Sequence, residues 1–139
     1  MRRLSDIVLD DKPLILSDVV SIAEASRWMH ESRAGSVLVT NDMGRLIGIF
    51  TSRDALHRVL AKDRDASATS LGDVMTKDPV TLSPEKSAID ALQLMWDGGF
   101  RHVPVVDGNH ILGIASRGDF RGEELQRLDD ERELWEHLR

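Results

Sequence analysis

The sequence predicts a mixed α/β (α+β) fold in which a β-α-β-β-α unit is written twice in tandem and followed by a C-terminal helix. Three observations support this. The motif Gly-x-x-[Ser/Thr]-x-x-Asp occurs at 48–54 and again at 113–119. Residues 13–17 match residues 79–83 at an offset of 66. Apolar residues change from helical to strand spacing at corresponding places in both copies. A repeat of this length indicates one duplicated supersecondary unit.

The first copy begins with a short strand predicted at 14–16, directly after a proline. A helix is predicted over 21–32. Ser21 and Glu24 have the spacing of a capping box, in which each side chain bonds the backbone N–H of the other residue. Apolar residues then recur at the spacing of one helical face.

A hairpin and a second helix complete the first copy. Apolar runs at 37–39 and 46–50 flank the turn-rich stretch 41–44, which predicts two antiparallel strands. A helix is then predicted from Thr51 to about Lys62.

The second copy repeats this order. A strand is predicted at 80–82, and a helix begins at Ser87 and ends before Gly98. A hairpin follows over 103–115, with Asp-Gly-Asn at 107–109 as a strong turn signal.

These elements predict repeats at 4–64 and 71–121, which we call the first and second copies, with a small, polar linker at 65–70. Residues 122–139 form a charged helical extension without a counterpart in the first copy. Its apolar residues at roughly helical spacing are Leu125, Leu128, Trp135 and Leu138. This stripe fits a solvated helix and a face that docks on a second chain equally well.

Composition excludes several classes of function. The net charge of −6 argues against a general nucleic-acid binder, and no apolar run has the length of a membrane span. The absence of cysteine rules out disulfides and thiolate chemistry. No apolar segment of a secretory signal follows the basic start, so we expect a cytoplasmic protein.

Catalytic and metal-site signals are also missing. The five histidines lack metal-ligand spacing, so no metal site is predicted. There is no Gly-rich phosphate loop and no local context that activates a serine nucleophile. We therefore expect no catalytic residues and no enzyme activity.

The repeat resembles a CBS domain pair (a Bateman module) of the free-standing bacterial type, over roughly residues 4 to 121. The second copy is the better match, through 73–76 (Asp-Val-Met-Thr), 79–81 (Pro-Val-Thr) and 101–107 (Arg-His-Val-Pro-Val-Val-Asp). The first copy departs from the family at 34–39, where the Arg-His-x-Pro pattern is missing.

This resemblance implies two units in pseudo-twofold symmetry with two clefts between them. Such clefts bind adenosyl ligands, namely AMP, ATP, NAD(H) or S-adenosylmethionine, and the residues do not choose among them. The resemblance also implies a homodimer that regulates a further protein. No cofactor is required, and an adenine nucleotide is the expected regulatory ligand.

The residue chemistry suits such a ligand. A carboxylate accepts hydrogen bonds from both hydroxyls of a ribose, a role for Asp54 and Asp119. Helix N-termini and arginines favour phosphate. By resemblance, the backbone near 80–82 reads the base edge. The candidate ligand-binding residues are Thr51, Arg53, Asp54, Val80, Thr81, Arg101, His102, Pro104, Ser116, Arg117 and Asp119.

A purely structural interpretation of the motif competes with this one, because [Ser/Thr]-x-x-Asp at a helix start is also a capping box. The alternative function is accordingly an interaction module that acts through dimerisation or partner binding, with empty or vestigial clefts. Asp119 has Ser116, Arg117, Arg101 and His102 near it in the pattern, whereas Asp54 has only Thr51 and Arg53. The second copy is therefore the first place to expect a ligand.

Overall fold

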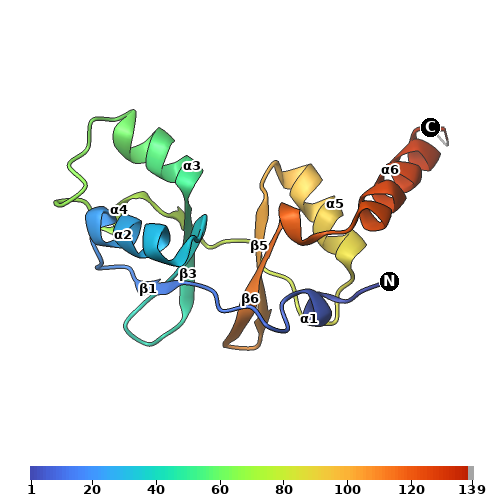
Figure 1. The fold of residues 1–139 in the computed structure, drawn as a ribbon, viewed down its shortest axis with the longest axis horizontal. Coiled ribbons are helices and arrows are strands. Elements are labelled where there is room, and N and C mark those ends of the chain that lie inside the picture. Colours follow the sequence, from blue (N-terminus) through green and yellow to red (C-terminus); the bar gives the residue numbers. More distant parts are fainter. Residues whose placement is uncertain (138–139) are drawn as a thin grey trace. The chain divides into compact units, whose positions relative to one another are not determined.

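A computed structural model describes residues 1–137 (Figure 1). The chain divides into two compact units. Residues 12–79 form one, here called the first-copy unit, and residues 1–11 join residues 80 onward in the other, the second-copy unit. In residues 1–137, no helix combines the length and apolarity needed to cross a membrane.

The first-copy unit contains a four-stranded sheet in the order β1-β2-β3-β4, with bounds β1 (Ile15–Ser17), β2 (Ser36–Thr40), β3 (Leu46–Thr51) and β4 (Thr76–Lys77). Strand β1 pairs parallel to β2, and the other pairs are antiparallel. The predicted first strand and hairpin are confirmed. The edge strand β4, from the start of the second copy, was not predicted.

Helix α2 (Ile22–Ser32) confirms the predicted helix and one half of its capping box. The Glu24 N–H donates to Ser21 Oγ at 3.1 Å. The second helix starts after Thr51, as predicted, with the single turn α3 (Ser52–Asp54). It continues as the π-helical segment η1 (Ala55–Leu60), which ends slightly before the predicted Lys62.

The core of the first-copy unit lies between these helices and the sheet. Its buried residues are Ile22, Ala25, Met29, Val37, Val39, Phe50, Val59, Leu71, Val74 and Met75. Three of them belong to the segment that opens the second copy, so this segment completes the first-copy core.

The second-copy unit contains helix α5 (Ala88–Gly98) and the hairpin of β5 (His102–Asp107) and β6 (His110–Ser116). Both were predicted, with α5 ending one residue later at a left-handed Gly99 (φ 69°). Its core is formed by Leu4, Val8, Ala88, Ala91, Leu92, Met95, Val103, Val105, Ala115, Phe120 and Leu128.

The predicted strand at 80–82 is wrong as a full strand, since it is reduced to a single bridge between Leu82 and Val105. Proline chemistry gives the reason. In the first copy, the Leu38 N–H donates to the Leu14 carbonyl at 2.9 Å. The corresponding Pro104 has no N–H, so it cannot form the same bond to Val80.

The two copies also differ after their hairpins. In the second copy a short 3₁₀ turn, η2 (Arg117–Asp119), is followed by Phe120 in an extended conformation (φ −91°, ψ 144°). Helix α6 (Gly122–His137) then begins. It confirms the predicted C-terminal helix, but Leu128 is buried in the core, so α6 serves as the closing helix of the copy. Of the predicted stripe, Leu138 lies outside the described residues.

The two copies exchange their opening segments. Helix α1 (Leu4–Ile7) belongs to the second-copy unit, where the Leu4 N–H donates to the Lys86 carbonyl at 2.8 Å. Helix α4 (Leu71–Val74) belongs to the first-copy unit, where the Leu71 N–H donates to the Val20 carbonyl at 2.9 Å. Each opening segment thus hydrogen-bonds the residue just before the N-cap of the other copy's first helix.

The glycine of the repeated motif accommodates this exchange. A Cβ added to Gly48 would overlap the side chain of Met75, and one added to Gly113 would lie 2.8 Å from the Cβ of Val8. Met75 and Val8 belong to the exchanged segments. The motif's glycine is therefore required by close packing in both copies.

Candidate functional site

The motif aspartates close the capping boxes that the sequence suggested. Asp54 Oδ2 accepts the Thr51 N–H at 2.9 Å and the Thr51 hydroxyl at 3.1 Å. Asp119 Oδ2 accepts the Ser116 N–H at 2.8 Å and the Ser116 hydroxyl at 3.0 Å. One carboxylate oxygen is thus used locally in each copy, and the second oxygen, Oδ1, determines what else the group can bind.

The second oxygen of Asp54 faces a cation. Arg58 Nε lies 3.8 Å from Asp54 Oδ1, and the side chain of Asp54 is only 16% exposed. Arg58 is itself held in place, because its Nη1 donates to the carbonyls of Val74 and Met75, each at 3.0 Å. A ribose hydroxyl at Asp54 would compete with a fixed guanidinium.

Asp119 has different surroundings. It is exposed, and its second oxygen has no hydrogen bond or ion pair to the part of the chain that the structure describes. The residue that corresponds to Arg58 is Glu123, which offers no cation. The extended Phe120 also takes the chain out of the helical path after Asp119. This carboxylate is the better placed of the two to accept a ligand hydroxyl.

Two arginines flank the same end of the second-copy hairpin. The Arg117 N–H donates to the Arg101 carbonyl at 2.9 Å, and His102 pairs in register with Ser116. Arg101 is exposed, while Arg117 and His102 are half-buried. The structure therefore places Arg101, His102, Ser116 and Arg117 at neighbouring backbone positions, close in the chain to Asp119. Arginine is the side chain whose forked hydrogen bonds suit a phosphate.

Small residues occupy the corresponding positions in the first copy. The Ser52 N–H donates to the Gly35 carbonyl at 3.1 Å, as Arg117 does to Arg101. Gly35 and Ser52 help to line an open groove of about 730 Å³ at the end of α2, together with His30 and Arg33. The sequence pattern did not predict this groove, although the small Gly35 was a signal for it.

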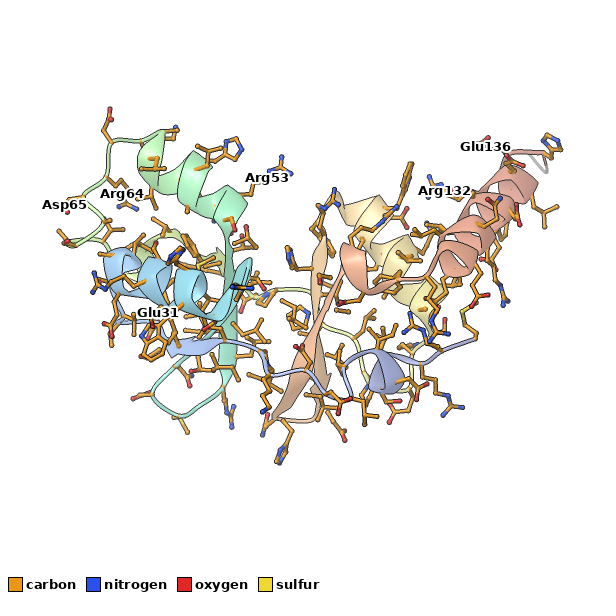
Figure 2. All side chains as sticks on the ribbon, viewed as in Figure 1. Glu31, Arg53, Arg64, Asp65, Arg132 and Glu136 are labelled. Atoms are coloured by element: carbon orange, nitrogen blue, oxygen red, sulfur yellow. The ribbon has the colours of Figure 1, made fainter. Side chains whose placement is uncertain are left out.

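The remaining candidates lie apart from these clusters. Pro104 is buried, whereas Val80 and Thr81 are exposed just before the single bridge at Leu82. Because Pro104 lacks an N–H, the Val80 carbonyl cannot accept the bond that the Leu14 carbonyl accepts from Leu38 in the first copy. In the first-copy unit, Arg53 is exposed and its side chain extends outward from the start of α3 (Figure 2).

Sequence reasoning also missed an ion pair between Arg2 and Glu124, at 2.6 Å. The signal was the contrast between copies, since Val59 and Thr69 occupy the corresponding positions. Within residues 1–137, no group of three or more His, Cys, Asp and Glu side chains could hold a metal ion.

The CBS domain family model matches residues 4–61 and 71–125. The chain belongs to the CBS domain family. The two matched segments are the two copies of the repeat, and together they make this chain a CBS pair.

Individual relatives agree. The chain is 35% identical over 121 residues to a mitochondrial CBS domain-containing protein of Arabidopsis thaliana, and the match covers 81% of this chain and 59% of the plant protein. The chain thus spans less than two thirds of that relative's length.

Solved structures show the same fold. The crystal structure of a CBS-domain-containing protein from Agrobacterium tumefaciens has a TM-score of 0.77 at 31% identity, covering 84% of this chain and 94% of its own. A CBS domain protein from Pyrobaculum aerophilum, complexed with AMP, has a TM-score of 0.82 at 24% identity, covering 92% of this chain and 98% of its own.

Proposed function

We propose that this CBS pair is a regulatory module that binds an adenosyl nucleotide, with the second copy as the principal site. One observation carries the proposal. Asp119 uses a single carboxylate oxygen for its cap, and its second oxygen has no hydrogen bond or ion pair to the described residues, while Arg101 and Arg117 are joined through their backbones at the same end of the hairpin. The AMP complex of the Pyrobaculum aerophilum protein supports the ligand class.

Different residues of the second copy bind different parts of the ligand. Asp119 accepts a ribose hydroxyl, and the Ser116 hydroxyl with Arg101, Arg117 and His102 holds phosphate. The Val80 carbonyl and the neighbouring Thr81 face the base edge, with Pro104 keeping that carbonyl out of the sheet.

The first copy supplies a weaker site. Thr51, Arg53 and Asp54 have the same chemistry, but the ligand would have to displace Arg58 from the second oxygen of Asp54. Since Arg58 also caps two carbonyls of the exchanged segment, its displacement has an energetic cost.

Regulation requires that the ligand prefer one arrangement of the copies, or of two chains, because only differential affinity shifts an equilibrium. We propose a cytoplasmic homodimer that acts on a regulated protein, not on nucleic acid or membrane, and that is not an enzyme. Repeats at 4–64 and 71–121, the linker 65–70 and the extension 122–139 remain the proposed domains.

A second candidate function is an interaction module that acts through partner binding without a ligand. Helix α6 favours it, because Leu134 is 60% exposed and Trp135 is 71% exposed on a surface helix. Apolar side chains of this size on one surface suit a protein partner.

A thermal-shift screen separates the two functions. AMP, ADP, ATP, NAD, NADH and S-adenosylmethionine are each added at millimolar concentration. A ligand at 100 times its Kd stabilises the native state by about 2.7 kcal/mol, which shifts Tm by several degrees in a domain of this size. We expect at least one compound to raise Tm. No shift with any of the six would refute nucleotide binding and leave the interaction module.

A further inference from the structure

The second-copy unit contains a partly buried ion pair that joins the N-terminal segment to α6. Arg2 Nη2 lies 2.6 Å from Glu124 Oε1, and Arg2 Nε donates to Glu124 Oε2 at 3.2 Å. The Glu124 side chain is only 4% exposed and that of Arg2 is 24% exposed. Two parallel bonds give this pair a defined geometry as well as energy.

The Glu124 carboxylate has a second task, because its Oε1 also accepts the Arg121 N–H at 2.8 Å at the start of α6. The hydrogen bond from Arg2 holds the pKa of Glu124 below its ordinary value, despite the opposing effect of burial. The same bond raises the pKa of Arg2. Both groups are therefore charged in the folded protein at neutral pH.

The fold does not need charges at these positions. In the first copy, Val59 corresponds to Glu124 and is 2% exposed within the core. Thr69 corresponds to Arg2, and its hydroxyl donates to the Asp65 carbonyl at 2.7 Å. A buried ion pair is weak evidence for stability, since apolar replacements are often neutral or stabilising. The pair therefore calls for a role other than packing.

Its third contact indicates that role. Arg2 Nη2 donates to the carbonyl of Asp119 at 3.0 Å. In the first copy, Asp54 leads directly into the helical Ala55 (φ −59°, ψ −43°), whereas Phe120 is extended. The chain after Asp119 is thus not held by a continuous helix. Arg2 holds this part of the chain by two routes. It donates to the Asp119 carbonyl, and it binds Glu124, which accepts the Arg121 N–H at the start of α6.

We propose that Arg2 is a positioning residue for Asp119, so that ligand binding in the second copy depends on the docked N-terminal segment, residues 1–11. This inference rests on the proposed nucleotide site. By linkage, a ligand that requires the docked segment also stabilises its docking by the same free energy. Ligand binding would then strengthen the docking of the N-terminal segment, although this segment is not among the candidate ligand contacts.

The first copy provides the matched replacement for a test. The double variant Arg2→Thr/Glu124→Val installs the first copy's residues, and the single variant Arg2→Thr leaves Glu124 buried without its partner. We expect the single variant to lower Tm and the double variant to recover most of that loss. The double variant keeps the net charge of wild type. Arg45→Thr, at an exposed arginine in the first-copy unit, controls for the charge lost in the single variant and for the loss of an arginine elsewhere.

Two readouts test positioning apart from stability. In calorimetric titrations with AMP and with ATP, the double variant should bind about tenfold more weakly than wild type, a typical coupling, while Arg45→Thr binds like wild type. Without ligand, amide hydrogen exchange at 119 and 120 should be faster in the double variant and unchanged at 54–57; Arg121 is left out because its N–H bonds to Glu124 itself.

Other results would overturn the inference. Wild-type affinity in a folded double variant would mean that the pair is only structural, and so would unchanged exchange at 119 and 120. If wild-type protein itself bound none of the six compounds of the thermal-shift screen, the positioning role would fall together with the proposed site. That failure is recognisable because it appears without any substitution.

Discussion

The first and second copies share a motif, a capping box and a core position for its glycine, yet they surround the motif aspartate differently. Asp54 faces Arg58, which is tied to two carbonyls, while Asp119 is exposed at a break between η2 and α6. The aligned positions whose differences bear on the site include Gly35 and Arg101, Leu38 and Pro104, Arg58 and Glu123, and Val59 and Glu124. A repeated motif therefore specifies a local structure, and its neighbours decide whether that structure can also bind.

The largest effect on stability is expected when the proline of the second copy, Pro104, is placed at the corresponding position of the first copy, Leu38. Leu38→Pro should destabilise the protein by at least about 2 kcal/mol, because the bond to the Leu14 carbonyl is lost and a leucine 1% exposed is removed from the core. Urea unfolding measures this.

The reverse exchange, Pro104→Leu, should change stability by less than about 1 kcal/mol. The new hydrogen bond and the greater chain entropy of the unfolded state roughly offset each other. It should still weaken nucleotide binding, since the Val80 carbonyl becomes engaged. Unaltered nucleotide affinity in Pro104→Leu would show that the Val80 carbonyl does not contact the ligand.

The motif glycines should respond unequally to alanine. Gly113→Ala places a Cβ 2.8 Å from the Cβ of Val8, which cannot turn away, and should cost about 1–3 kcal/mol. Gly48→Ala meets the flexible side chain of Met75 and should cost less. Thermal unfolding of both variants ranks them, and equal losses would show that the two exchanged segments pack with the same rigidity.

Acid should act on the second-copy unit through Glu124. Its pKa is lowered in the folded state by the hydrogen bond from Arg2, so its stabilising contribution is present above the unfolded pKa of about 4.3. That contribution is lost as the pH falls through the lower, folded pKa. Between pH 5 and pH 3, unfolding of wild type should therefore depend on pH more steeply than unfolding of Glu124→Gln. Parallel pH profiles would contradict this.

The C-terminal helix offers the smallest effect on stability. Deleting residues 122–139 is not a clean test of self-association, because Leu128 belongs to the core. Leu134→Ser/Trp135→Ser alters only exposed side chains and should change stability by less than about 0.5 kcal/mol. We expect weaker self-association by light scattering, and an unchanged mass at high concentration would assign these residues to solvent.

The sequence predicted the elements well wherever a local signal existed, as at the Ser21 cap of α2 and the turn at 107–109. It could not predict the exchange of α1 and α4, because packing between segments far apart in the chain leaves no periodic trace. The periodic pattern predicts a full strand at 80–82, but it does not register that Pro104 has no N–H, and only the bridge at Leu82 forms. The signal for the Arg2–Glu124 pair is a difference between the copies, because Thr69 and Val59 occupy the corresponding positions.

Calorimetric titration of AMP into wild type, Asp119→Asn and Asp54→Asn tests the central claim most directly. Asparagine keeps one oxygen for the cap but replaces the second with a donor, so each variant should fold. Asp119→Asn loses only the diol acceptor, whereas Asp54→Asn also loses the ion pair with Arg58. We predict that Asp119→Asn weakens AMP binding at least about tenfold, or 1.4 kcal/mol, while Asp54→Asn stays within about threefold. Equal affinities for all three proteins, or a greater loss in Asp54→Asn, would contradict the assignment of the ligand to the second copy.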